Sequence, residues 1–149
     1  MNRKDSTYYK FRCGSSEYSE LAKIRDFISE NALGHGIGEE IVSKVALAVD
    51  EACANLIRHA YKLDKSHEIC ISLQINPDNL EIDILDDGQP FNPLEVPTQN
   101  MKDYFDRYQK GGLGIHIIKK IMDEIVYIPS DTDHPQNILK LIKQVKCNC

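Results

Sequence analysis

Three polar side chains are spaced so that they share one face of a helix. Glu51, Asn55 and His59 are four residues apart in a mainly apolar segment, and residues four apart are neighbours on a helix surface. The residues between Glu51 and Asn55 (52–54) are small, with the sequence Ala-Cys-Ala, so a ligand could come close to the carboxylate and the amide. Taken alone, such a stripe is also typical of a solvated helix face.

A second group of polar residues follows a predicted strand. The strand runs into the sequence DDGQPF, which begins at Asp86. A carboxylate at a strand end can point into a pocket, and Gly88 leaves room for a ligand against the backbone. Taken alone, Asp-Asp-Gly is typical of a simple turn.

The third group is the sequence Gly111-Gly112-Leu113-Gly114 at the start of a predicted helix. Glycines allow backbone N–H groups to face a phosphate, and a helix N-terminus adds partial positive charge. The sequence is neither a Walker loop nor a dinucleotide fingerprint, and alone it fits a flexible helix start. Residues 34–38 are also rich in glycine, but a helix precedes them, so we interpret them as a helix stop and a short loop.

The elements that must position these groups follow from hydrophobic periodicity. In the first half of the chain we expect a strand over residues 8–13, a helix capped by Ser16 that ends near Gly34, and a long helix over residues 39–61. Alternating residues then predict a hairpin of two strands, 69–75 and 80–84, around an Asn-Pro-Asp-Asn turn.

In the second half, residues 88–110 contain three prolines and no regular spacing, which is typical of a functional lid. A third helix is predicted from Leu113, with apolar positions up to Ile125, and two strands follow over residues 125–128 and 137–143. The order of elements predicts an α+β fold, a two-layer α/β sandwich with helices on one face of a mostly antiparallel, mixed sheet.

Composition narrows the class of protein. The chain has 149 residues, which fits a single domain over residues 1–149, and its net charge is −5. No basic surplus points to nucleic acid, and the longest apolar run, residues 45–49, is far shorter than the roughly 20 residues of a membrane helix. The polar N-terminus and five cysteines without a Cys-x-x-Cys pair favour reduced thiols and a cytoplasmic location.

Together, the three motifs resemble the ATP-binding fold shared by gyrase, a heat-shock chaperone, sensor histidine kinases and the mismatch-repair protein MutL. This is the GHKL, or histidine kinase-like, ATPase superfamily, with its Bergerat-type ATP-binding fold. The strongest resemblance is to bacterial anti-sigma-factor serine/threonine kinases of partner-switching pathways. Residues 49–61 resemble the family's Asn-containing box, 86–91 its adenine box, 111–124 its glycine box and 137–141 its closing strand. The resemblance covers about residues 6–143.

The resemblance implies a role for each matching residue. Glu51 would be the catalytic general base that accepts the proton of a substrate serine hydroxyl. Asn55 would be the Mg²⁺ ligand, through its amide oxygen. Asp86 would accept a hydrogen bond from the adenine amino group of ATP, and Gly88 would let the base lie close. The phosphates would be bound near the glycine box, by Lys110, Gly111, Gly112, Leu113 and Gly114.

Three positions qualify this assignment. Lys110 matches a basic residue near the γ-phosphate in relatives, with a solvated lysine as the alternative, and His59 fits helix packing at least as well as a role in the site. Pro90 replaces the second Gly of the general pattern Asp-x-Gly-x-Gly, and Phe91 follows as in many anti-sigma kinases. The chain therefore resembles a subgroup variant, with an altered backbone beside the adenine.

The resemblance implies an ATP-dependent protein-serine kinase and anti-sigma regulatory factor, with ATP and Mg²⁺ as cofactors. Its partners would be an anti-anti-sigma (STAS-type) protein and a sigma factor or similar regulator, with no direct nucleic acid and no membrane. The alternative is a non-catalytic ATP-binding module that sequesters a protein partner. The sequence has no helical dimerisation module with a phosphoaccepting histidine, which argues against a complete sensor kinase. Relatives often dimerise, so a homodimer is a further expectation.

Overall fold

The computed structural model describes residues 6–13, 18–60, 67–90, 92–95 and 114–145. Its elements in chain order are β1 (Thr7–Cys13), η1 (Tyr18–Glu20), α1 (Leu21–Gly34), α2 (Glu39–Asn55), η2 (Leu56–Ala60), β2 (Ile69–Ile75), β3 (Asn79–Asp86), η3 (Pro93–Glu95), α4 (Gly114–Ile121), β4 (Glu124–Ile128) and β5 (Asn137–Gln144). η1 and η3 are short 3-10 turns, whereas η2 is a π-helical turn that continues α2.

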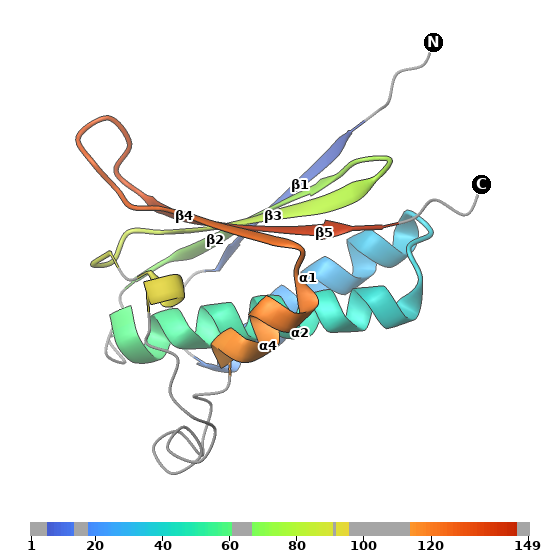
Figure 1. Cartoon of the computed structure of the whole chain (residues 1–149), viewed down its shortest axis with the longest axis horizontal. Helices are drawn as coiled ribbons and strands as arrows, with labels where there is room; N and C mark the ends of the chain where they lie inside the picture. The colour runs from blue at the N-terminus through green and yellow to red at the C-terminus, as the bar shows by residue number, and fades with distance from the viewer. Residues whose placement is uncertain (1–5, 14–17, 61–66, 91, 96–113, 146–149) are drawn as a thin grey trace.

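The strands form one five-stranded sheet in the order β1-β2-β3-β5-β4 (Figure 1). Every pairing between the described strands is antiparallel. Along β2 and β3, buried aliphatic residues alternate with partly exposed ones, because successive side chains of a strand point to opposite faces. The Asn76 N–H donates to the carbonyl of Asn79 at 2.9 Å and closes the turn between them. The predicted hairpin is therefore confirmed.

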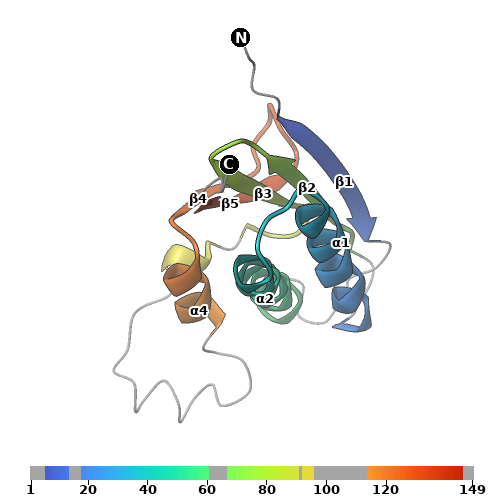
Figure 2. The same ribbon diagram turned by 90° about the vertical axis from the view of Figure 1, so that its right-hand side faces the viewer.

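The described α-helices, α1, α2 and α4, cover one face of this sheet (Figures 1 and 2). α2 lies between α1 and α4 and packs against both. Buried aliphatic side chains from both layers fill the space between helices and sheet, among them Ile24, Val45, Ile71, Ile82 and Ile118. The predicted α+β two-layer sandwich is thus confirmed, but the described sheet is antiparallel throughout rather than mixed. Within the described segments, no helix combines the length and hydropathy that crossing a membrane requires.

Two helix ends differ from the sequence prediction. The helix expected over residues 39–61 is α-helical only as far as Asn55 and then widens into η2. The third helix ends at Ile121, before Ile125, the last position of its predicted apolar pattern. The strand predicted over residues 125–128 is confirmed as β4. The N–H of Asp123 donates to the carbonyl of Ile142 at 2.9 Å and ties the chain to the sheet directly after the helix. Apolar spacing alone did not show either change.

The glycine-rich loop at residues 34–38 connects α1 to α2, as predicted. Gly36 has a φ of +84°, a backbone region that favours glycine. The N–H of Gly36 donates to the carbonyl of Leu33 at 2.9 Å and ends α1. The loop is therefore explained by the helix stop. Ser16, the expected cap of α1, lies outside the described residues.

Candidate functional site

The polar stripe of α2 is largely removed from solvent. Asn55 is only 8% exposed, Glu51 is half-buried, and residues 52–54 between them are buried. A buried amide costs free energy unless it is hydrogen-bonded, and here Nη1 of Arg58 donates to Oδ1 of Asn55 at 3.2 Å. The burial and this contact contradict the alternative of a solvated helix face.

The surroundings of Glu51 favour its protonated form more than water does. Burial raises the pKa of the Glu51 carboxyl, the negative charge of Asp50 raises it further, and the positive charge of Arg58 lowers it. The net result is a pKa above the usual value. Asp50 in turn pairs with Arg25 of α1, with 2.5 Å between Nη1 and Oδ1. A half-buried carboxyl with a raised pKa is suited to accept a proton near neutral pH.

Asp86 ends β3 deep inside the protein, opposite Asn137 at the start of β5. Asp86 is 2% exposed and Asn137 is 1% exposed. Oδ1 of Asp86 accepts hydrogen bonds from the Gly88 N–H (2.8 Å) and from Nδ2 of Asn137 (3.1 Å). These donors satisfy part of the hydrogen-bonding capacity of a side chain that is costly to bury without partners. The bond from Gly88 is the Asx-turn contact that Asp-x-Gly favours, and the burial of Asp86 is the additional feature that a turn alone does not predict.

Asn137 joins three backbone segments around this carboxylate. Its Nδ2 also donates to the carbonyl of Gly88 at 2.9 Å, and its Oδ1 accepts a hydrogen bond from the Ser130 N–H at 2.8 Å. One buried amide thus holds together the end of β3, Gly88 two residues beyond it and the loop before β5. Asn137 is therefore well placed to orient Asp86.

The first two predicted motifs adjoin across the interface between sheet and helices. Burial raises the pKa of the Cys53 thiol, and the nearby charges of Asp50, Cys13 and Asp86 raise it further. The carboxylate of Asp86 is therefore close enough to act on a residue that lies between Glu51 and Asn55 on α2.

Part of the third motif lies outside the described residues. This applies to Lys110, Gly111, Gly112 and Leu113, and the side chain of His59 is likewise not described. Gly114 is the first residue of α4, which packs against α2. The structure therefore places the end of the glycine box beside the helix that carries Glu51 and Asn55.

Sequence reasoning missed two residues of this site. Asn137 was matched only to a closing strand. It lies on the inward face of β5 together with the buried residues Leu139 and Leu141, which follow at every second position. A polar residue at an inward strand position was a usable signal. Arg58 follows Asn55 by three residues, a spacing that places them on neighbouring helix positions, and this signal was also available.

The residues present fit an adenine nucleotide with Mg²⁺. Oδ1 of Asn55 already accepts a hydrogen bond from a cationic group, and the same lone pairs can coordinate a hard cation. Mg²⁺ commonly uses one or two protein ligands together with phosphate oxygens and water. Asp86 supplies a buried acceptor for the base. Asn55 and Asp86 are therefore the residues that would hold the metal and the adenine.

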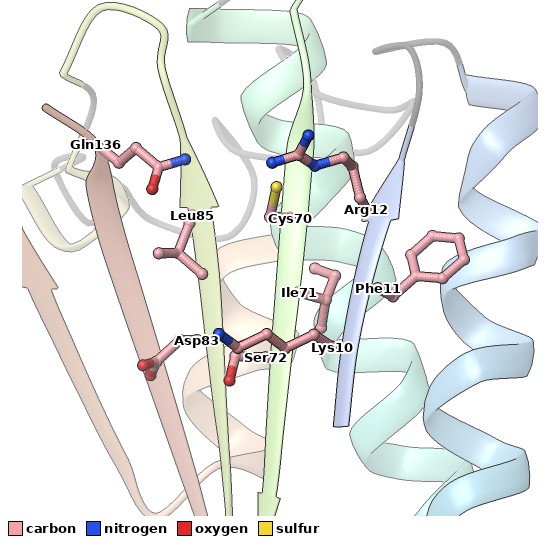
Figure 3. Close-up of a pocket in the computed structure, with 9 residues that line it drawn as sticks. All are labelled: Lys10, Phe11, Arg12, Cys70, Ile71, Ser72, Asp83, Leu85 and Gln136. Atoms are coloured by element: carbon pink, nitrogen blue, oxygen red, sulfur yellow. The ribbon is translucent and has the colours of Figure 1, made fainter. Parts of the chain in front are cut away.

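A separate pocket of about 410 Å³ lies over β1, β2 and β3 (Figure 3). Arg12, Cys70, Ser72 and Asp83 line it. Cys70 and Ser72 alternate with the β2 isoleucines that face the helices, so this pocket opens on the other face of the sheet. Of the residues predicted to bind ATP, none of those that the structure describes lines this pocket.

Comparisons with known proteins agree with the motifs. A family model described as the histidine kinase-like ATPase domain matches residues 14–143. Serine-protein kinase RsbW of Bacillus subtilis (strain 168) is 33% identical over 107 residues, which are 68% of this chain and 66% of that protein. Serine-protein kinase RsbW of Listeria innocua is 31% identical over 114 residues, which are 73% of this chain and 71% of that protein. The chain thus spans about two thirds of the length of these relatives.

A solved structure supports the fold alone. The crystal structure of the SiaB-SiaC complex from Pseudomonas aeruginosa contains a chain with a TM-score of 0.50 and 12% sequence identity. The match covers 92% of this chain and 89% of that chain. The resemblance found in the three motifs is confirmed by the family match and the kinase relatives: the chain belongs to the family of histidine kinase-like ATPase domains.

Proposed function

We propose that this chain is an ATP-dependent protein-serine kinase and anti-sigma regulatory factor. It would phosphorylate a serine of an anti-anti-sigma (STAS-type) protein and sequester a sigma factor or similar regulator. The observation that carries the proposal is the half-buried Glu51, whose pKa is raised, one helical turn before the buried Asn55. The names of the serine-protein kinase relatives support the same activity.

Recognition of the nucleotide is assigned to both layers of the fold. Asp86, held by Asn137, would accept a hydrogen bond from the adenine amino group, and Gly88 would let the base lie against the backbone. Asn55 would be the protein ligand of Mg²⁺, which when bound supplies positive charge that stabilises the transferring phosphoryl group. Lys110 and the glycine box from Gly111 to Gly114 would contact the phosphates, as an expectation from the sequence.

Phosphoryl transfer is assigned to Glu51. As the serine oxygen of the substrate attacks the γ-phosphorus, its proton passes to the Glu51 carboxylate, and the bond from the γ-phosphorus to ADP breaks. Only the ionised carboxylate can accept that proton. Because the pKa of Glu51 is raised, the rate of transfer should fall as the pH drops through a value above that of an ordinary glutamate.

The biological setting is part of the same proposal. The chain would act in the cytoplasm, as one ATP-binding domain over residues 1–149, and it would form a homodimer. These points rest on the sequence and on the family resemblance. Size-exclusion chromatography with light scattering would test the dimer directly.

The decisive experiment compares two neighbouring carboxylates of α2. Glu51→Gln should lower the rate of transfer from radiolabelled ATP to a purified antagonist by a factor of at least about 100, because it removes the general base. Calorimetry should show that ATP binding is retained. Asp50→Asn is the matched control, since Asp50 pairs with Arg25 rather than serving as the base, and it should retain most of the transfer rate.

The outcome separates the two readings of the sequence. Unchanged transfer by the Glu51→Gln protein would refute the assignment of the base. Tight ATP binding with no transfer to any partner by the wild-type protein would favour the non-catalytic module that sequesters its partner. Absence of ATP binding at millimolar ATP would refute both readings.

A further inference from the structure

A cation already lies at the oxygen on which the proposed metal site depends. Nη1 of Arg58 donates to Oδ1 of Asn55 at 3.2 Å, and Arg58 is half-buried. The positive charge of Arg58 also reaches Glu51, whose pKa it lowers. Glu51, Asn55 and Arg58 follow each other at steps of four and three residues, so they share one helical face. The guanidinium therefore lies among the groups that the proposed function uses.

The backbone at Arg58 is π-helical rather than α-helical. Arg58 is the central residue of η2, the π-helical turn Leu56–Ala60. Such turns are rare and are frequently found at functional sites. Leu56 and Ile57 in the same turn are 7% and 1% exposed. These buried neighbours anchor the turn, while the long side chain of Arg58 reaches back to Asn55.

Arg58 and Mg²⁺ would need the same lone pairs of Asn55. Mg²⁺ binds oxygen at about 2.0–2.1 Å in near-octahedral geometry, whereas a guanidinium remains charged at every physiological pH. Two cations close to one neutral oxygen repel each other. ATP brings phosphate oxygens, which a guanidinium can bind through two parallel hydrogen bonds. Binding of Mg·ATP would thus remove one partner of Arg58 and supply another.

We propose that Arg58 and Mg²⁺ exchange at Asn55: the guanidinium occupies Oδ1 in the nucleotide-free protein and moves to the polyphosphate when Mg·ATP binds. This inference rests on the proposed ATP site. Arg58 is then a positioning residue that holds the Asn55 amide in place before the nucleotide arrives. It also supplies charge to the phosphates when Mg²⁺ is scarce.

The exchange is tested by binding, without phosphoryl transfer. The Kd of ATP is measured by calorimetry with excess Mg²⁺ and with EDTA, for the wild type and for Arg58→Gln. Glutamine keeps an amide donor for Asn55 but carries no charge. We expect the Kd in EDTA to rise about tenfold, the effect of losing one charge-assisted hydrogen bond. The Kd with Mg²⁺ should change less than about threefold, because removing the competing cation offsets the lost contact.

Two variants serve as controls. Arg58→Lys keeps a cation and should restore most of the metal-free affinity. Arg25→Gln removes one positive charge from α1 near the same carboxylates, since Arg25 pairs with Asp50. It should leave the ratio of the two dissociation constants close to that of the wild type.

Each outcome decides the inference. If Arg58→Gln changes neither constant, or raises both equally, Arg58 does not exchange with Mg²⁺ and the inference is wrong. If the wild type binds no ATP with Mg²⁺, the proposed function fails and the inference fails with it. If Arg58→Gln does not fold, the Nε–H signal of Arg58 in ¹⁵N-labelled wild-type protein provides the test. That signal should shift on addition of Mg·ATP, and an unchanged signal would overturn the exchange.

Discussion

Strands β3 and β5 carry two cross-strand pairs with opposite surroundings. Asp83 lies opposite Lys140, and Asp86 lies opposite Asn137, three residues further along β3. Because three is an odd number, the pairs point to opposite faces of the sheet. Nζ of Lys140 lies 2.9 Å from Oδ1 of Asp83, with each side chain 28% exposed. The Asp86–Asn137 pair is almost completely buried.

The contrast shows why the buried carboxylate has an amide partner rather than a cation. An ammonium group at the position of Asn137 would pay a large desolvation penalty and would neutralise Asp86. The amide of Asn137 donates a hydrogen bond to one oxygen of Asp86 without bringing a second charge into the core. The outer pair, in contact with water, joins two oppositely charged groups.

The largest effect that separates the two pairs is expected from Asp86→Asn. The amide would point a donor instead of an acceptor at the amino group of adenine, so we expect the Kd of Mg·ATP to rise about 100-fold. Calorimetric titration measures this change. Asp83→Asn is the matched control on the same strand, and its Kd should stay within about twofold of the wild-type value. Equal effects of the two substitutions would show that the ligand does not contact Asp86.

A smaller effect, with a defined pH dependence, is expected from Asn137→Asp. Two carboxylates at hydrogen-bonding distance share one proton, so the folded state raises the pKa of one of them above its unfolded value. A group with a raised folded pKa contributes stability at low pH and loses it as the pH rises through the folded pKa. The variant should therefore be destabilised by about 2–3 kcal/mol at neutral pH and by less at pH 5.

Urea denaturation of the wild type and Asn137→Asp at pH 5 and pH 8 measures this difference. The ATP affinity of the variant should fall about tenfold at pH 8, because Asp86 loses the amide that orients it. A deficit in stability that did not grow between pH 5 and pH 8 would show that the two carboxyl groups do not interact. The Asp86–Asn137 hydrogen bond would then not be the feature that distinguishes the inner pair.

The sequence predicted the architecture well because the apolar pattern is regular where the layers meet. Alternation over residues 69–75 and 80–84 led directly to the antiparallel hairpin, and the helical period of α1 and α2 identified their buried faces. The order of the motifs also led to the family. These features depend on local periodicity, which a single sequence displays.

The sequence did not predict features that depend on contacts between distant segments. The hydrogen bond from Asn137 to Asp86 joins residues 51 positions apart, and strand periodicity does not reveal which polar groups meet. The change to a π-helical turn at η2 leaves the apolar spacing of Leu56 and Ile57 intact, so it left no signal in the pattern. The roles of Glu51 and Asn55 remain predictions, supported by their burial and by their place on α2.

The smallest effect is expected from Lys140→Met, which removes the cation of the outer pair. Burial alone would lower the pKa of Lys140, but the hydrogen bond and charge of Asp83, with the charge of Glu81, raise it above the usual value. The ion pair is partly exposed, so its loss should cost only about 0.5–1 kcal/mol at neutral pH. A lysine whose pKa is higher in the folded state contributes its full stabilisation at a pH below the unfolded-state pKa. This stabilisation is lost as the pH rises through the folded-state pKa. The difference in melting temperature between wild type and variant should therefore stay constant around neutral pH and become smaller in strongly alkaline buffer. It should also become smaller in high salt, which screens the ion pair.

The ATP affinity of Lys140→Met should not change, because this pair lies on the sheet face away from the helices. A loss of affinity comparable to that of Asn137→Asp would mean that the two faces of β3 are coupled.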